Sequence, residues 1–339
     1  REHMVSADLQ PQHKTFSLGL EFIERNVESD NWYLQIETFD PHEPFFTQQE
    51  FQDLYPHEYD GPAFDWPPYR EVREDDLTVA HIRYMYASLV TYCDQQLGRV
   101  LDVFDKHDLW QDTMLVVNTD HGFLMGEHDW WAKVVTPFFQ EVAHIPFWIY
   151  DPRQPNCVAE TRDSVVQTID LPPTILDYFE IPATRDMQGE PLARTILNDE
   201  PVREAALYGV MGGQVNVTDG QYVYMRGNVT EDNAPLFEYT LMPTHMNSLF
   251  SVRELSDWEK FEDFSFTKGC PIMQIPSRTP RFLLARDNPY GKGRTATLLF
   301  DVQADPGQTN PLVDADIEAR MIKLMLHNSC IQSFNFFLN

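Results

Sequence analysis

A long amphipathic segment followed directly by a short apolar run constrains the fold of this chain more than any other feature. Between Glu74 and Lys106, apolar residues recur at spacings of three and four, which is typical of a helix with one buried face. The run MLVVNTDHG at 114–122 then has the continuous apolar character of a strand buried on both faces. A second such run, IPFWIYDP, follows at 145–152. Strands that alternate with helices indicate an α/β domain with a mostly parallel sheet flanked by helices.

The pattern of the sequence changes after about residue 200. Two apolar stretches flank Asp219-Gly220, which is a strong signal for a β-hairpin. RTATLLFDV at 294–302 predicts another strand, and the spacing of apolar residues over 314–327 predicts an amphipathic helix. We therefore expect an α/β domain over residues 1–200 and a smaller antiparallel α+β subdomain over residues 201–339.

The charge of the chain argues against two classes of partner. Its 25 Lys and Arg residues oppose 53 Asp and Glu residues, which gives a formal net charge of −28. Such a chain repels nucleic acid and anionic membrane surfaces over long range. No apolar run reaches the ~18 residues that a membrane-spanning helix needs. We expect no nucleic acid and no membrane as partner, and the sequence indicates no particular cellular compartment.

The apolar run at 114–119 ends in Asp120-His121-Gly122. In open α/β sheets, ligands bind beyond the carboxyl ends of the strands, and Gly122 gives the backbone the freedom to turn both side chains toward that edge. A carboxylate beside an imidazole suits a divalent cation, with Ca²⁺, Mg²⁺ or Mn²⁺ ahead of zinc. The alternative is an Asp that caps the next turn beside a His that packs locally.

The segment GEHDWWAK at 126–133 follows at once and adds a cation. The Lys133 ammonium is a compact point charge that suits a tetrahedral oxyanion such as sulfate or phosphate. His128 is a candidate to bind the substrate or support the metal, and its alternative is an ordinary loop histidine. Glu127 is a candidate to orient a neighbour.

Two further histidines lie in loops far from this segment. His42 stands in FDPHEPF at 39–45, where two prolines end any regular element, so we place it on a loop after a strand. His245, in MPTHM at 242–246, is either a contact to the substrate or an ordinary loop histidine.

Five segments, in the same order along the chain, resemble the sulfatase family of the alkaline phosphatase superfamily. The family pattern (S/T)DHG-x(3)-GEH-x(2)-W-x-K is similar to the segment that ends at Lys133. The other segments resemble the family's catalytic-histidine loop, its E-x(3)-hydrophobic-P segment, its S-x-x-D-hydrophobic-x-P-T element and its C-terminal L-Y-D-L-x-x-D-P signature. The five segments span 39–45, 118–133, 137–153, 165–181 and 298–312.

This resemblance implies an alkaline-phosphatase-like fold and hydrolysis of an organic sulfate ester with release of sulfate. It implies that Asp120 and His121 are ligands of an active-site divalent metal, Ca²⁺ before Mn²⁺ or Mg²⁺. Lys133 would contact the sulfate, and His42 would act on the leaving-group side, where an imidazolium can protonate the departing alkoxide. The substrate would be a small-molecule or carbohydrate sulfate ester, with His128 and His245 as candidate contacts.

One part of the family's machinery has no counterpart in this sequence. Family members carry a Cys or Ser within C/S-x-P-S/T-R that is converted to formylglycine, and no segment of the chain matches that motif. We expect the formylglycine and two Asp metal ligands on an N-terminal segment before Arg1, with residues 1–200 forming the C-terminal part of the catalytic domain. Two ligands alone hold a hard cation weakly, so we expect this chain to be inactive without that segment.

Two other functions stay open from the sequence. Hydrolases of phosphonate or phosphate mono- and diesters share the Asp-His-Gly, the downstream Lys and the metal, so they are the nearest alternative. A non-catalytic binding protein that retains a hydrolase fold is the other, and it predicts no uptake of metal.

Overall fold

The computed structural model describes most of the chain and divides it into two units. The described residues are 6–133, 137–230, 233–242, 244–245, 248–262, 264–277 and 296–331. The first unit comprises Arg1–Lys133 and Ile145–Glu160, and the second comprises Val134–His144 and Thr161–Asn339. Residues 161–200 therefore pack with the C-terminal half. The assignment of residues 1–200 and 201–339 to separate domains stays a prediction.

The long helix α3 (Asp76–His107) confirms the helix expected from the apolar spacing. It begins where the Asp75 carboxylate accepts a hydrogen bond from the backbone N–H of Thr78, which caps the first turn. It ends at Asp108, whose φ of 54° is left-handed. Its charged residues keep it water-exposed along one side.

Within the described ranges, none of the helices combines the length and the hydropathy needed to cross a lipid bilayer.

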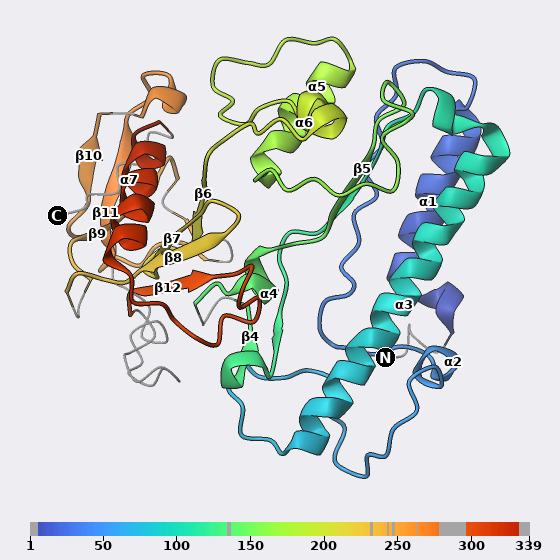
Figure 1. The fold of residues 1–339 in the computed structure, drawn as a ribbon, viewed down its shortest axis with the longest axis horizontal. Helices are drawn as coiled ribbons and strands as arrows, with labels where there is room; N and C mark the ends of the chain where they lie inside the picture. Colours follow the sequence, from blue (N-terminus) through green and yellow to red (C-terminus); the bar gives the residue numbers. More distant parts are fainter. Residues whose placement is uncertain are drawn as a thin grey trace. The chain divides into compact units, whose positions relative to one another are not determined.

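The helix α1 (Pro11–Asn26) lies along the C-terminal half of α3 (Figure 1). Apolar side chains from both helices and from the turn after α3 form a buried cluster there. On the outer side, the Glu24 carboxylate accepts hydrogen bonds from Lys106 Nζ at 2.7 Å and His107 Nε2 at 2.9 Å. The buried members of this cluster are Ile23, Val100, Val103, Phe104 and Leu109.

The N-terminal half of α3 carries a second core, which the aromatic loop at 45–71 covers. This loop contains the one-turn helix α2 (Gln49–Gln52) and ends in the short strand β1 (Arg70–Glu71). Because the loop packs its aromatic rings on a rigid helix, the residues at its start have a defined position. The buried members of this core are Phe45, Phe51, Ile82, Met85, Leu89, Tyr92 and Trp131.

The strands of the first unit correct the expectation of a mostly parallel sheet. β2 (Leu115–Asn118) pairs with β5 (Phe147–Tyr150), and β4 (Trp130–Ala132) pairs with β1 and β3 (Leu124–Met125). Every one of these pairings is antiparallel. The chain leaves β2 at Asn118 and returns opposite it at Phe147, so it makes a long hairpin instead of a crossover. An α/β arrangement is confirmed, but apolar character alone did not reveal the direction of the strands.

The second unit contains the antiparallel sheet and helix expected after residue 200. β6 (Ala206–Gly209), β7 (Val215–Thr218), β8 (Tyr222–Arg226) and β12 (Leu298–Asp301) form a four-stranded sheet in the order β12-β8-β7-β6. The predicted hairpin joins β7 to β8, with Gly220 at a φ of 92°. The helix α7 (Ala315–Ile331) packs on this sheet (Figure 1). Their shared core contains Ala205, Leu207, Val217, Tyr224, Leu299, Met321 and Met325.

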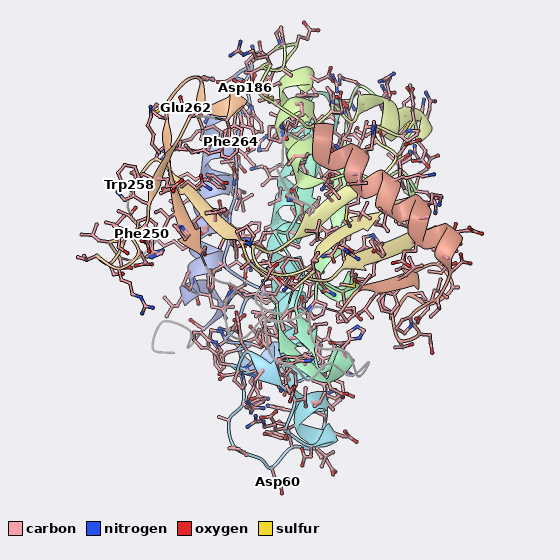
Figure 2. The ribbon with its side chains drawn as sticks, turned by 90° about the vertical axis from the view of Figure 1, so that its left-hand side faces the viewer. Asp60, Asp186, Phe250, Trp258, Glu262 and Phe264 are labelled. Carbon is pink, nitrogen blue, oxygen red and sulfur yellow. The ribbon has the colours of Figure 1, made fainter. Side chains whose placement is uncertain are left out.

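The chain between β8 and β12 contains a second sheet of the same unit. β8 and β12 are hydrogen-bonded neighbours, yet the chain between them builds a separate antiparallel sheet in the order β10-β11-β9. Its strands are β9 (Leu236–Thr240), β10 (Glu259–Phe261) and β11 (Ile272–Ser277). The rings of Tyr239, Phe261 and Phe264 lie 5.0–5.2 Å apart and form an aromatic cluster on it. Trp258, Glu262 and Phe264, labelled in Figure 2, belong to the turns on either side of β10.

A buried ion pair between Asp170 and Arg203 fixes the start of the helix α5 (Leu171–Tyr178). The other short helices of this unit are α4 (Gln140–Ala143) and α6 (Ala193–Asn198). The fully buried Asp170 accepts hydrogen bonds from the backbone N–H groups of Gln167 at 2.8 Å and Glu190 at 2.9 Å. Both of its carboxylate oxygens also accept hydrogen bonds from the Arg203 guanidinium. The carboxylate of the Asp-Leu-Pro-Pro segment is therefore structural.

Replacing Arg203 by Met is expected to lower the free energy of unfolding by about 3–5 kcal/mol, because it leaves the Asp170 charge buried without its partner. Chemical denaturation of the purified chain measures this change. Arg194→Met is the matched control, since its ion pair with Glu200 is exposed, with 73% and 47% of the two side chains accessible. An exposed pair contributes about 0–1 kcal/mol. Equal losses in the two variants would contradict a structural role for the buried pair.

Candidate active site

Asp120 and His121 lie just beyond the end of β2, with their donor atoms side by side. The Asp120 side chain is 81% exposed and the His121 side chain is 35% exposed, and Asp120 Oδ2 lies 3.4 Å from His121 Nε2. Asp120 Oδ1 accepts a hydrogen bond from the backbone N–H of His121 at 2.9 Å. Both side chains are thus presented at the strand end, as the sequence predicted.

These two groups fit two adjacent positions around one divalent cation. His121 Nδ1 donates a hydrogen bond to the Gly122 carbonyl at 3.0 Å, which leaves the Nε2 lone pair available to a metal. Ligands at right angles around a cation at about 2.3–2.6 Å lie roughly 3.3–3.7 Å apart, which agrees with the observed separation. No group of three or more His, Cys, Asp or Glu side chains that could hold a metal occurs among the described residues. The pair supplies only part of a coordination shell.

The turn after β3 is held in an uncommon conformation by α3. Gly126, His128 and Asp129 have φ values of 96°, 53° and 61°, all in the left-handed region. Arg83 of α3 donates from Nε to the Met125 carbonyl at 2.8 Å and pairs with Glu127 Oε1 at 3.0 Å. Glu127 therefore links this turn to the helix, and a role in orienting a neighbour in the active site stays a prediction. This turn at 126–129 leads directly into β4, which begins at Trp130.

Lys133 directly follows β4, and the buried indole ring of Trp131 fixes the position of that strand. Trp131 is fully buried, and its Nε1–H donates to Glu74 Oε2 at 2.9 Å. Burial raises the pKa of Glu74, but hydrogen bonds from Arg70, from Trp131 and from the backbone more than offset this and hold that pKa at about 2. Glu74 therefore stays ionised and keeps β4 fixed beside α3. Only 7% of Lys133 is exposed.

Lys133 and His42 meet although 91 positions separate them in the sequence. Lys133 Nζ forms a hydrogen bond with His42 Nε2. The Lys133 ammonium also lies 5.9 Å from the ring centroids of Tyr69 and Phe123, so aromatic side chains surround it. The His42 ring packs on Phe39, with their centroids 4.1 Å apart. The structure thus joins two of the residues that the sequence singled out.

A buried carboxylate that sequence reasoning missed stands behind this pair. Glu43 is 1% exposed, and its Oε1 accepts a hydrogen bond from the Tyr69 hydroxyl at 2.5 Å. Its Oε2 lies 3.2 Å from His42 Nδ1 and 3.5 Å from Lys133 Nζ. Burial, followed by the hydrogen bond to Glu43 and the charge of Glu43, raises the pKa of Tyr69, so this phenol stays a neutral donor.

The structure gives the two remaining candidates local contacts of their own. The Nε2 atom of His128 is shielded from solvent. The exposed His245, in the second unit, contacts Glu254 Oε1 through Nε2 at 2.6 Å. Hydrogen bonds from Ser251, then from His245, hold the pKa of Glu254 at about 2, so this carboxylate is ionised. A role in binding substrate stays a prediction for both histidines.

Comparisons with known proteins agree with the sequence patterns. The family model described as Sulfatase matches residues 10–181, just over half of the chain. The chain is 26% identical over 199 residues to an arylsulfatase of Clostridium perfringens, which covers 54% of this chain and 41% of that protein. It is 23% identical over 189 residues to an N-acetylglucosamine-6-O-sulfatase of Bacteroides thetaiotaomicron, covering 52% of this chain and 33% of that protein. The chain matches less than half the length of these two relatives.

Among solved structures, the fold is similar to that of a phosphonate monoester hydrolase of Agrobacterium radiobacter. The TM-score is 0.62 at 16% sequence identity, and the match covers 97% of this chain and 61% of the other. This likeness places the chain in an alkaline-phosphatase-like fold.

Proposed function

Because the chain belongs to the sulfatase family, we propose that it supplies part of a metal-dependent active site that hydrolyses an organic sulfate ester and releases sulfate. The observation that carries the proposal is the contact between Lys133 and His42 in a nearly buried, aromatic-walled position. A cation and an imidazole held together in this way suit a reaction in which an anionic group is transferred and an alkoxide departs.

The two residues of this contact have separate roles in the proposal. The Lys133 ammonium stabilises negative charge on the sulfuryl group during transfer, and it does so strongly because few water molecules can screen it. The His42 imidazolium delivers its Nε2 proton to the ester oxygen as the bond between sulfur and that oxygen breaks, and the ring becomes neutral. Both groups are preorganised by α3 and its loop, so little rearrangement accompanies the reaction.

Asp120 and His121 would hold the divalent cation. When bound, a divalent cation acts as a Lewis acid on a sulfate oxygen. The further ligands and the formylglycine nucleophile that this family uses are proposed to come from sequence outside this chain, because the chain contains no C/S-x-P-S/T-R motif.

The proposed substrate is a sulfate ester of a carbohydrate. Support comes from the name of a relative, the N-acetylglucosamine-6-O-sulfatase. His128 and His245 are the proposed contacts to substrate groups beyond the sulfate. They can donate or accept hydrogen bonds to sugar hydroxyls.

Turnover by the protein in its full natural length tests the proposal. We expect it to release sulfate from 4-nitrophenyl sulfate and from N-acetylglucosamine 6-sulfate faster than it cleaves a phosphonate monoester. Dominant cleavage of the phosphonate monoester would replace the sulfatase assignment with the related hydrolase. Absence of turnover together with absence of metal uptake would support a non-catalytic binding protein.

A further inference from the structure

Glu43 is a buried acid that no described role accounts for. It follows His42 directly in the sequence and is almost fully enclosed, with 1% of its surface exposed. A buried carboxylate is unfavourable unless cations and hydrogen bonds compensate its charge. Tyr69 satisfies Oε1, whereas Oε2 faces both His42 Nδ1 at 3.2 Å and Lys133 Nζ at 3.5 Å. Oε1 is thus hydrogen-bonded, whereas the buried Oε2 lies close to the two cationic groups without a hydrogen bond to any described residue.

The hydrogen bonds of His42 fix which nitrogen carries its proton. His42 Nδ1 lies 2.8 Å from the Glu43 backbone carbonyl, and a carbonyl can only accept, so Nδ1 is protonated. Nε2 of a neutral ring is then an acceptor, and it faces the Lys133 ammonium. A second proton on Nε2 would place two positive charges in direct contact. The Glu43 carboxylate is the negative charge that makes this state accessible.

We propose that Glu43 is a positioning residue that holds His42 with Nδ1 protonated and balances the charge of the Lys133–His42 pair, so that Nε2 is the atom that carries the transferred proton. This inference rests on the proposed function, since it assigns His42 the delivery of that proton. Tyr69 keeps the carboxylate in place by binding Oε1 and leaving Oε2 for the two cations. The aromatic rings around Lys133 lower the local dielectric, which strengthens each of these charge interactions.

Asp40 is a second acid whose charge acts on His42, so its effect on the protonation of His42 has to be distinguished from that of Glu43. The charges of Asp40 and His42 interact, and burial raises the pKa of Asp40 to about 6, an effect that the charge of His42 partly opposes. Asp40 therefore changes charge near pH 6. The groups that act on His42 are thus Glu43 and Lys133 directly, Asp40 through space, and Tyr69 through Glu43.

The test measures the protonation of His42 directly and through catalysis in the full-length protein. Glu43→Gln keeps the shape and an acceptor for the Tyr69 hydroxyl but removes the negative charge. We expect the midpoint of the His42 ring titration, followed by NMR and assigned with His42→Gln, to fall by about 1 pH unit or more. The alkaline limb of the kcat profile should move down by the same amount, with KM little changed. A midpoint within error of the wild type would overturn the inference.

Matched variants separate this effect from loss of structure. Glu24→Gln removes another carboxylate of the same unit, one that pairs with Lys106 and His107, and should leave the His42 midpoint in place. Asp40→Asn reveals any contribution from Asp40, and Glu43→Asp should restore most of the wild-type midpoint. A fall in stability and kcat at every pH, without a shift, would show that Glu43 is merely structural.

Two results keep the inference and the proposed function distinguishable. If Glu43→Gln does not fold, Tyr69→Phe replaces it. That variant removes the hydrogen bond from Oε1 and concentrates the charge on the carboxylate, so the His42 midpoint should rise, and an unchanged midpoint would overturn the inference. A shifted midpoint in a protein that hydrolyses no sulfate ester would instead contradict the proposed function alone.

Discussion

Replacing Lys133 by Met is expected to lower kcat/KM for sulfate-ester hydrolysis by about 10²–10³-fold, because the ammonium that stabilises the transferring group is lost. The substitution keeps most of the apolar stem of the side chain and removes the ammonium that lies 5.9 Å from the ring centroids of Tyr69 and Phe123. The effect should be large because Lys133 is 7% exposed, so water cannot replace its charge. Steady-state kinetics of the full-length protein measure this change.

The control for this variant is Lys106→Met. Lys106 pairs with Glu24 on the surface, and 59% of its side chain is exposed. Its replacement should change kcat/KM by less than about twofold, as expected of a surface position. Thermal unfolding of both variants is needed, because the loss of Lys133 also leaves Glu43 with less compensation. If a stably folded Lys133→Met protein lost only about tenfold or less in kcat/KM, the proposed role of Lys133 would be contradicted.

Asp120→Ala is expected to remove the bound metal and to lower kcat/KM by about 10³-fold or more, because a Lewis acid contributes several kcal/mol to such a reaction. The fold should be little affected. The carboxylate is 81% exposed and its interactions lie within its own turn, so the free energy of unfolding should change by no more than about 0.5 kcal/mol. A stable but inactive and metal-poor protein is thus the expected result.

Metal analysis by mass spectrometry and an activity assay check this second prediction. Asp112→Ala is the control, since Asp112 is an exposed acid that precedes the other end of β2. Chelation followed by addition of Ca²⁺, Mn²⁺ or Mg²⁺ identifies the cation that restores turnover. Full metal content in Asp120→Ala would show that the metal is held elsewhere.

The elements that local patterns encode were predictable from the sequence. The apolar spacing of α3, the Asp219-Gly220 hairpin and the amphipathic α7 each depend on residues within a few positions of one another. The direction of β2 against β5 depends instead on where residues 119–146 return to the sheet. An apolar run reports burial and not direction, so this part of the fold was predicted wrongly.

The same distinction separates the parts of the candidate site. Asp120, His121 and Lys133 lie within one short motif, and His42 belongs to a second segment that resembles the family, so all four were singled out from the sequence. Glu43 was not, because a charged residue between two prolines normally indicates an exposed loop. Its burial depends on Tyr69 and Lys133, which lie 26 and 90 positions away, and no local pattern reports that contact.

Because β8 and β12 are hydrogen-bonded neighbours, the four-stranded sheet does not depend on the β9-β10-β11 sheet that the chain forms between them. Antiparallel neighbours need only a turn of about 2–5 residues between them, so the four-stranded sheet and α7 can close without residues 227–297. Insertions, deletions and substitutions within that segment therefore leave the hydrogen bonds of the supporting sheet intact. We therefore expect the scaffold to tolerate changes in the β9-β10-β11 sheet and to lose stability when the core around Met321 and Met325 is changed.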